Sequence, residues 1–339
     1  MVTIVDIAKE TGLSISICSR YFNHIRVRKK NADAIEKAAK KLGYIPNELA
    51  RNLRKEKSFT VGAIIPSLID SFPLSVLNVV EKKLNANNYS LLLSNSQRDE
   101  EREYKCAVSL IQKKVEALVI LPISNCHRIA ELCKKYNIPL IIFDQYIDDI
   151  QTADFVLFDN VAASQKATKV ILKKGHKNIA IVIGPKNEYT PKERLAGFEA
   201  ECSKHKGIKT YVVEADGYSS QDAYAALMKF KHIKEISAIY ATNFDMTLGV
   251  VKALNKKGLK IPTDISLMGF DYLPTFEYIQ PNLSSIYQST SEIGSVVCDR
   301  IFSRFENKNA DGRCISYVSV HEKRGESISN LAKKGKKNG

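Results

Sequence analysis

The hydrophobic pattern of the first 45 residues predicts short helices only. The stretch Thr3–Asn23, TIVDIAKETGLSISICSRYFN, contains two short amphipathic segments that meet at a TGLS corner. Thr3 and Ser14 stand where helices would begin, and Gly12 stands where the first would end. A third segment, Ala32–Leu42, has apolar residues at helical spacing and is followed by a glycine. The residues expected to face inward are Ile4, Ile7, Ala8, Ile17, Cys18, Ala34, Ile35, Ala38, Ala39 and Leu42.

From Thr60 onward the pattern changes to short apolar runs that alternate with helical spacing. Alternating buried strands and helices predict parallel sheets with helices on both faces. The region is too long for one such sheet and too short for three, so we expect two lobes, although no sequence repeat marks them. The predicted strands are Val61–Ile65, Leu91–Leu93, Ala117–Leu121, Leu140–Phe143, Ile179–Ile183, Ala238–Tyr240 and Ile265–Met268; the clearest helical segments are Leu74–Leu84, Cys106–Val115, Ala162–Leu172 and Leu248–Leu254.

Between these two regions lies Pro46–Lys57, PNELARNLRKEK, a basic and weakly apolar linker. Pro46 suits the start of a helix. One or two helical turns bury little surface by themselves, so this segment should become ordered only against a partner.

Charge is concentrated at the two ends of the chain. Of the formal net charge of +14, residues 1–58 contribute +7 and residues 323–339 contribute +5, which leaves about +2 for the middle. A basic N-terminal region favours contact with a polyanion there. The C-terminal residues AKKGKKNG have no apolar anchor and should be disordered.

Several classes of protein are disfavoured by composition. The longest apolar runs are too short to span a bilayer, and Met1–Glu10 lacks the pattern of a signal peptide, so we expect a cytoplasmic location. The seven cysteines form no CxxC pair and suit reduced, packed thiols. Neither a nucleotide-binding glycine motif nor a metal-type cluster of histidines occurs, so we expect no enzyme activity, no metal and no cofactor. The acidic stretch Asp99–Glu103, DEERE, is expected to be the solvated first turn of a helix.

The second N-terminal segment has the features of a DNA-reading helix. If Ile17 and Cys18 face inward, the outward side chains of its first turns are Ile15, Ser16, Ser19 and Arg20. A helix-turn-helix needs this arrangement, because side chains near the N-terminus of its second helix reach base edges in the major groove. An ordinary capped helical hairpin is the alternative, and the basic charge around the segment counts against it.

The chain also resembles the lactose-repressor (LacI/GalR) family of bacterial transcription regulators. The headpiece motif TIVDIAKETGLSISICSRYFN and KKLGYIPNELARNLR are similar to that family's pattern. The motifs TVGAIIP, FDN, KKGHKNIAIVIG, RLAGF, GLKIPTDISLMGFD and LSSIYQ follow in the family's order, and the resemblance extends to about residue 322. It implies an α/β fold: an all-α helix-turn-helix headpiece, and a periplasmic-binding-protein-like core of two doubly wound parallel-sheet lobes.

The resemblance implies boundaries for each part. These are residues 1–45 for the headpiece, 46–58 for a hinge helix, 59–322 for a core that binds the effector and dimerises, and 323–339 for a basic tail that is largely disordered toward its end. One lobe should comprise about 59–158 plus 289–322, and the other about 159–288.

The family's DNA-contacting positions carry over to both the headpiece and the hinge. Ile15 and Ser16 match the variable base-reading positions, and an apolar Ile15 suits a thymine methyl group. Leu53 matches the leucine that wedges into a minor-groove step. The full set of DNA-binding residues implied is Thr3, Ser14, Ile15, Ser16, Ser19, Arg20, Asn23, Asn47, Ala50 and Leu53.

The family's effector lies in the cleft between the two lobes. Asp159, Arg194 and Asp271 match its principal polar positions, and such carboxylate and guanidinium groups suit hydroxyl-rich ligands. Phe72, Asn243 and Gln288 are weaker matches, with Phe72 as a wall against a sugar face. His176 in KGHKN is expected to be structural.

This chain departs from the family pattern at two places. Phe244 stands where an aspartate is usual, which leaves open whether Asp245 reaches the same place. Arg28 replaces a serine that usually caps the third helix, so that helix can begin differently.

The sequence therefore predicts a sequence-specific transcription regulator, expected to be a repressor. The partners implied are a near-palindromic double-stranded operator, a sugar or sugar derivative as effector, and a second copy of the chain, with a tetramer as the larger alternative. A protein corepressor in place of the sugar stays open. A sugar-binding transport protein would have a signal peptide and no basic headpiece.

Overall fold

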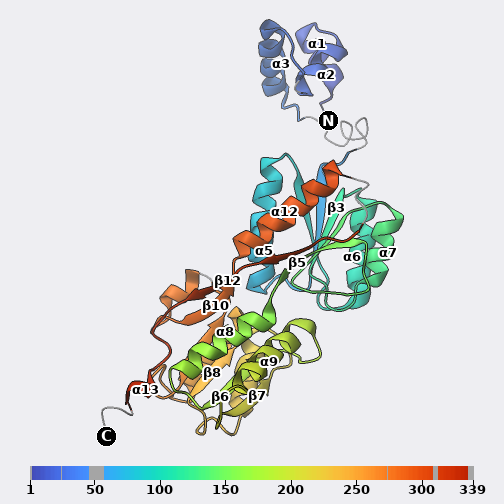
Figure 1. Ribbon diagram of the computed structural model, residues 1–339. Helices are drawn as coiled ribbons and strands as arrows, with labels where there is room; N and C mark the ends of the chain where they lie inside the picture. Colours follow the sequence, from blue (N-terminus) through green and yellow to red (C-terminus); the bar gives the residue numbers. More distant parts are fainter. Residues whose placement is uncertain (1, 24, 46–56, 273, 308–311, 335–339) are drawn as a thin grey trace. The chain divides into compact units, whose positions relative to one another are not determined.

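The computed structural model describes residues 2–23, 25–45, 57–272, 274–307 and 312–334 (Figure 1). The chain divides into two units, Met1–Phe59 and Thr60–Gly339. The described residues of the first unit form three helices, in the places where the sequence predicts them: α1 (Ile4–Thr11), α2 (Ile15–Phe22) and α3 (Lys29–Leu42).

Local capping explains where these helices begin and end. The backbone N–H and the hydroxyl of Thr3 both donate to the Asp6 carboxylate at 2.8 Å, and the Ser14 hydroxyl accepts from the Ile17 N–H at 3.3 Å. Gly12 and Gly43 end α1 and α3 in the left-handed conformation, with φ of 67° and 63°, which glycine adopts without strain.

The three helices share a small core built around Ile7, Cys18 and Ile35, which are fully buried. The prediction for Ala34 was wrong, because this residue is exposed. The third helix begins at Lys29, earlier than the apolar pattern indicates, and Arg28 precedes it without a side-chain cap.

The second unit contains two lobes, and each lobe has one six-stranded sheet. The sheet of the first lobe has the order β11-β5-β4-β3-β1-β2, and all of its pairings are parallel. The strands are β1 (Thr60–Ile65), β2 (Ser90–Asn95), β3 (Ala117–Ile120), β4 (Leu140–Phe143), β5 (Ala153–Phe158) and β11 (Ile315–Val318).

The second sheet repeats this order as β12-β10-β9-β8-β6-β7. Its edge strand β12 runs antiparallel to β10, and its other pairings are parallel. The strands are β6 (Asn178–Ile183), β7 (Lys209–Glu214), β8 (Ala238–Ala241), β9 (Ser266–Phe270), β10 (Ser284–Gln288) and β12 (Val320–Lys323).

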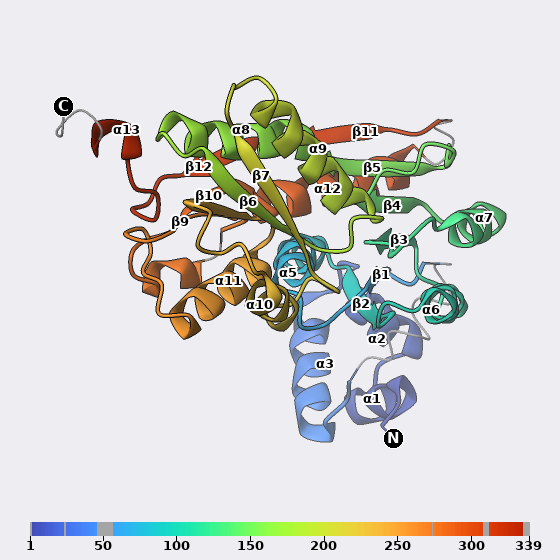
Figure 2. The same ribbon diagram turned by 90° about the horizontal axis from the view of Figure 1, so that it is seen from below.

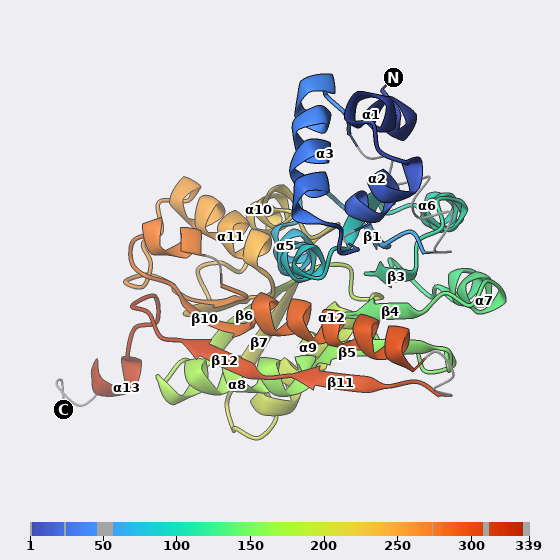
Figure 3. The same cartoon turned by 90° about the horizontal axis from the view of Figure 1, so that it is seen from above.

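Helices cover both faces of each sheet. Figure 2 shows α8 and α9 on one face of the second sheet and α10 and α11 on the other. In the first lobe α12 packs along α5, although the two are far apart in the sequence (Figure 3). The helices are α5 (Ser71–Ala86), α6 (Glu100–Gln112), α7 (His127–Lys135), α8 (Asn160–Lys173), α9 (Tyr189–Cys202), α10 (Ser220–Lys229), α11 (Phe244–Lys256) and α12 (Thr290–Glu306).

All seven predicted strands are present, but five strands were not predicted. The sequence of β5, ADFVLF, is interrupted by Asp154, which is buried in an ion pair with Arg304. Both β7 and β10 mix polar and apolar residues, and β11 and β12 are four residues long at the sheet edges. These strands depend on tertiary pairing more than on their own apolar runs.

The chain passes between the lobes three times, at Asp159, Ser289 and Ser319. The first two passages lie where the predicted lobe boundaries lie. The third comes earlier than the predicted end of the first lobe at residue 322, because β12 pairs with β10 in the second sheet.

Beyond β12 the chain packs against the second lobe instead of leaving it. Ser327 is fully buried, and its hydroxyl donates to the Leu267 carbonyl at 2.6 Å. His176 holds the same segment, with its Nε2 3.1 Å from the Ser329 carbonyl oxygen. Burial lowers the pKa of His176, so this ring is neutral and structural. The segment ends in α13 (Leu331–Lys334), and residues 335–339, predicted to be disordered, lie outside the described residues.

No helix among the described residues is long and apolar enough to cross a bilayer.

Candidate functional site

Two surfaces carry the residues singled out from the sequence, and the first is the exposed side of α2 in the N-terminal unit. Ile15 is 48% exposed at the start of this helix, beside exposed Ser16, and Arg20 lies one turn further on. About half of the Ile15 side chain is therefore accessible to a molecule outside this small unit.

The remaining predicted DNA contacts have local roles as well. Ser14 caps α2, and Asn23 ends it by donating from Nδ2 to the Ser19 carbonyl at 2.7 Å. The Thr3 hydroxyl is engaged with Asp6. Asn47, Ala50 and Leu53 lie outside the described residues.

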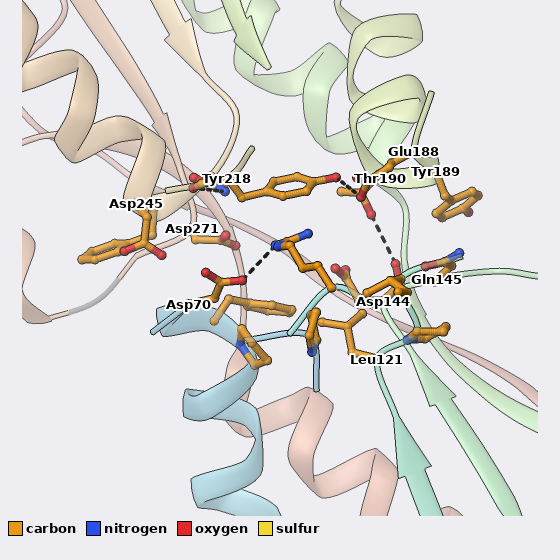
Figure 4. Close-up of a pocket in the computed structure, with 18 of the residues that line it drawn as sticks. Asp70, Leu121, Asp144, Gln145, Glu188, Tyr189, Thr190, Tyr218, Asp245 and Asp271 are labelled. Carbon is orange, nitrogen blue, oxygen red and sulfur yellow. Dashed lines mark hydrogen bonds and ion pairs between the residues drawn. The ribbon is translucent and has the colours of Figure 1, made fainter. Parts of the chain in front are cut away.

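The second surface is a cavity of about 100 Å³ between the two lobes of the core. Its lining comes from loops that follow the carboxyl ends of strands in both sheets, where ligands of doubly wound folds bind. From the first lobe these include Pro66, Arg98, Leu121 and Asp144; from the second they include Tyr218, Asn243, Asp271 and Gln288 (Figure 4).

Arg194, on the first turns of α9, is the central basic group of this cavity and is only 4% exposed. Its Nε donates to the Asn160 side-chain oxygen at 2.8 Å, and its Nη1 donates to the Thr242 carbonyl. Its guanidinium also lies 3.6 Å from the centre of the Phe270 ring. These contacts fix the plane of the guanidinium, so that its remaining N–H groups have a set direction.

Two aspartates occupy equivalent positions in the two lobes. Asp144 directly follows β4 and Asp271 directly follows β9, with φ of 61° and 63°. Each backbone N–H donates to the adjacent strand, to Val156 and Ile286 respectively. The Oδ1 atoms of both aspartates are buried and have no hydrogen-bond partner in the described part of the chain.

Burial disfavours the charged form of both carboxyl groups. It raises the pKa of Asp271 to about 7 and that of Asp144 to about 6, while the charge of Arg194 opposes the rise in each case. Since the charge of Asp144 also raises the pKa of Asp271, the two groups interact and should titrate as a pair.

The weaker sequence candidates also line the cavity. Both amide heteroatoms of Gln288, at the end of β10, are buried and make no hydrogen bond of regular geometry among the described residues. The amide nevertheless lies close enough to both aspartates to lower the pKa of each. Asn243 caps α11, accepting from the Met246 N–H at 2.6 Å, and its Nδ2 donates to the Tyr218 carbonyl at 3.3 Å. Phe72 lies on the first turn of α5.

Asp159 is the sequence candidate that the structure does not place at the cavity. Its side chain is exposed and caps α8, where it accepts from the Ala162 N–H at 2.8 Å. The next residue, Asn160, is buried and holds Arg194. The prediction of a direct lining role for Asp159 is therefore corrected.

The side chains of Phe244 and Asp245, where the chain departs from the family pattern, point to different places. Phe244 lines the cavity and stacks on Phe276 with ring centres 4.6 Å apart. Asp245 reaches across to the other lobe and accepts from the Ser71 backbone N–H at 3.2 Å and from its hydroxyl at 3.1 Å. Asp70, the residue that precedes α5, makes no cap with its own side chain, so Asp245 supplies one from the opposite lobe.

Two further contacts join the lobes at the cavity. The Arg98 guanidinium lies 4.7 Å from the centre of the Tyr218 ring, and Tyr218 donates to Glu188 at 2.7 Å. The Thr190 hydroxyl donates to the Asp144 carbonyl at 3.3 Å (Figure 4). The lobes therefore meet through direct polar contacts around the cavity.

Comparison with known proteins identifies the family. Residues 3–47 match the family model of bacterial regulatory proteins of the lacI family. Residues 58–319 match the model of periplasmic binding proteins and the sugar-binding domain of the LacI family. The chain belongs to the LacI family.

LacI-family relatives match over nearly the whole length of the chain. The HTH-type transcriptional repressor PurR of Pasteurella multocida is 28% identical, with 92% of this chain and 94% of that protein covered. The ribose operon repressor of Escherichia coli K12 is 27% identical, with 96% and 99% covered. A crystal structure of the lac repressor dimer bound to operator and the anti-inducer ONPF is 22% identical and aligns with a TM-score of 0.82, with 97% and 99% covered.

Membership of the LacI family confirms the predicted fold and general function. The protein is a DNA-binding transcription regulator with a core of the LacI-family sugar-binding type, and members of this family are not enzymes.

The matches to family motifs did not predict several of the residues that line the cavity of the core. Asp144 follows the predicted strand Leu140–Phe143, so the rule that sites lie at carboxyl strand ends could have found it. Glu188, Tyr218 and Arg98 had no such signal.

Glu103 differs from its predicted setting. Instead of being solvated, it is only 3% exposed and accepts from the N–H of Ile123, a lining residue, at 3.2 Å. Burial raises the pKa of this carboxyl to about 7.

Proposed function

We propose that this protein is a homodimeric, cytoplasmic repressor that binds a near-palindromic operator and responds to a sugar-type effector held between the core lobes. The observation that carries the proposal is the cavity itself: a fixed guanidinium faces two unpaired carboxyl groups at the carboxyl ends of the strands. Groups of this kind hold adjacent hydroxyls.

At the operator, α2 is the reading helix. Ile15 contacts a thymine methyl group, Ser16 and Arg20 contact base edges, and Ser14, Ser19, Asn23 and Thr3 fix the headpiece on the phosphates. The exposure of Ile15, Ser16 and Arg20 supports these roles.

Residues 46–58 act as the hinge helix in this proposal. Leu53 wedges into a minor-groove step, with Asn47 and Ala50 beside it. Two half-sites at fixed spacing require two copies of the chain, because one headpiece buries little DNA surface.

In the cleft, Arg194, Asp271 and Gln288 bind the effector, together with Asn243 and Phe72. Asp144 joins them as the equivalent of Asp271 in the other lobe. The effector changes the contacts between the lobes, and this change resets the hinge. The ribose operon repressor among the relatives supports a sugar as the effector class.

Removal of residues 1–58 tests the DNA-binding part of the proposal. The remaining core should fold, dimerise and bind its effector, because it has its own buried cores, but operator binding should be lost. Gel-shift titration with operator DNA measures the loss, and circular dichroism confirms folding. A shortened protein that shifts operator as well as the full chain does would contradict the proposal.

A further inference from the structure

The charges that line the inter-lobe cavity are unbalanced. Five acidic side chains face two basic ones around the cavity. The acidic residues are Asp70, Asp144, Glu188, Asp245 and Asp271, and the basic residues are Arg98 and Arg194.

Both guanidinium groups of the lining are already engaged. Arg98 donates to Asp70 at 2.9 Å and lies against the Tyr218 ring. Arg194 is held by Asn160, by the Thr242 carbonyl and by Phe270, and its charge acts on Asp144 and Asp271. An added anion would compete with carboxylates for these two cations, and the described lining offers no third one.

The buried polar atoms at the cavity that lack a regular hydrogen bond suit a ligand that donates hydrogen bonds. They are Asp144 Oδ1, Asp271 Oδ1 and the two heteroatoms of the Gln288 amide. The amide group is the one donor among them and it already acts on both carboxyls, so acceptors remain in excess. A hydroxyl group satisfies either protonation state of these aspartates, because it donates to a carboxylate and accepts from a carboxylic acid. A phosphate or carboxylate has only acceptors to offer an ionised aspartate.

The remaining lining is apolar and the space is small. Phe72 and Leu121 from one lobe and Phe244 from the other can cover the C–H faces of a ring. At about 100 Å³, the cavity is well below the roughly 300–1,000 Å³ of pockets for drug-sized ligands. One sugar ring suits this space better than a nucleotide or a disaccharide does.

We propose that the cavity is selective for an uncharged, single-ring sugar and excludes phosphorylated and carboxylated sugars. This inference rests on the proposed function of the cleft as the effector site and specifies its ligand class. The reason for exclusion is that an anionic group would have to lie desolvated beside an excess of carboxyl groups, with Arg98 paired with Asp70 and the single charge of Arg194 shared between Asp144 and Asp271.

The experiment is a titration of the full chain at pH 7.5, by calorimetry and thermal shift, with matched sets of sugars. The probes are D-aldopentoses and D-aldohexoses, each beside its terminal phosphate and its uronic or aldonic acid. At least one neutral sugar should bind, and its phosphorylated and carboxylated forms should bind at least tenfold more weakly.

A charge-matched pair of variants tests the cause. The double variant Asp144→Asn, Asp271→Asn removes the acidic excess and should lower the ratio of neutral to phosphorylated affinity at least threefold. The double variant Asp264→Asn, Asp299→Asn is the control, because it also neutralises two aspartates, and both are exposed and lie outside the cavity lining. Its ratio should match that of the unmodified chain.

Three other outcomes would contradict the inference or the proposed function. If an acidic or phosphorylated sugar binds more tightly than its neutral parent, the inference is overturned while the proposed function stands. If the control and the cavity double variant change the ratio equally, the lining carboxyls are not the cause and the inference also falls. If no probe binds although operator binding is intact, both the inference and the proposed small-molecule effector are contradicted. A protein corepressor then becomes the better proposal.

Discussion

In the first lobe the outermost strand is β2, SLLLSN, and the equivalent strand of the second lobe is β7, KTYVVE. The exposed residues of β2 include Leu92 and Leu93, which are 36% and 42% exposed. Consecutive residues point to opposite faces, so each face of this edge strand leaves one leucine partly exposed. No charged residue protects β2, whereas β7 begins with Lys209 and ends with Glu214.

The edge of the second lobe is protected by a cluster of polar and aromatic groups. Glu235 accepts from Lys209 at 2.7 Å and from the Tyr211 hydroxyl, and the His232 ring stacks against Tyr211 with ring centres 5.3 Å apart. Charged side chains on an edge strand oppose pairing with another chain. The two sheets have the same order, but one ends in an exposed apolar strand, where the proposed dimer would meet, and the other ends in a polar strand.

The same two lobes carry one shared feature at the cavity. Asp144 and Asp271 occupy equivalent positions with the same backbone conformation, yet Asp271 has the higher pKa. The lobes thus agree in backbone conformation at the cavity and differ in the side chains of their outermost strands. Two sheets with the same strand order can therefore have outermost strands of different polarity.

The largest expected effect comes from breaking the asymmetry of the edges. Leu92→Asp combined with Leu93→Asp should dissociate the dimer and weaken operator binding roughly 100-fold, because the two headpieces no longer act together. The matched control Val212→Asp, at an exposed residue of β7, should leave the dimer intact. Light scattering and gel-shift titration measure both effects; dissociation by the control alone would reverse the assignment of the interface.

A second prediction concerns the cavity groups that the lobes share. Arg194→Ala or Asp271→Ala should weaken effector binding at least tenfold, or by about 1.4 kcal/mol or more, because the remaining buried groups lose their partners. Operator affinity without effector should stay within roughly threefold. Titration of effector against operator-bound protein gives the comparison, and variants that respond like the unmodified chain would remove the cleft from the mechanism.

The aspartate pair also predicts a dependence of stability on pH. A buried carboxyl with a raised pKa stabilises the folded state below its ordinary pKa, and that contribution is lost as pH rises through the folded value. The ligand-free core should therefore lose on the order of 4 kcal/mol of unfolding free energy from these groups between about pH 5 and pH 8, because the folded-state pKa is about 7 for Asp271 and about 6 for Asp144.

Asn variants of the pair make this measurement specific. Urea unfolding at both pH values should show that Asp271→Asn loses less unfolding free energy than the unmodified chain does. Asp144→Asn should also lose less, and its difference from the unmodified chain should arise in the lower part of the pH range. An unchanged loss in both variants would assign the pH dependence to other groups, of which Glu103 is the first candidate because its pKa is also about 7.

The smallest expected effect is at the contact that joins the lobes. Asp245→Asn replaces a charged acceptor by a neutral one at the Ser71 N–H and should weaken effector binding about two- to fivefold, as expected for a loss of about 0.5–1 kcal/mol. Calorimetry measures the change, with Asp264→Asn, at an exposed aspartate outside the cavity lining, as the control. Stronger binding in Asp245→Asn would mean that this contact opposes the ligand-bound arrangement.

Much of this protein followed from its sequence alone. Capping residues at Thr3, Ser14 and Gly12 determined two helices, because their effects are local. Buried runs such as Leu140–Phe143 predicted strands, because a strand covered on both faces must be apolar throughout. The order of motifs identified the family, and with it Arg194 and Asp271 as cavity residues.

Other features depended on residues that are distant in the sequence. Asp154 is acceptable within β5 only because Arg304 pairs with it, 150 residues later, and β12 joins the second sheet only because β10 offers an edge. Asp144 and Asp271 occupy equivalent positions, but no sequence repeat around them reveals it. Two lobes can have the same backbone path with different side chains, because packing does not require most side chains to be identical. Asp159 and Asn160 are adjacent in the sequence, but the turn from β5 into α8 exposes the first and buries the second against Arg194. Only the tertiary structure could decide between them, because burial is set by the elements that surround a residue.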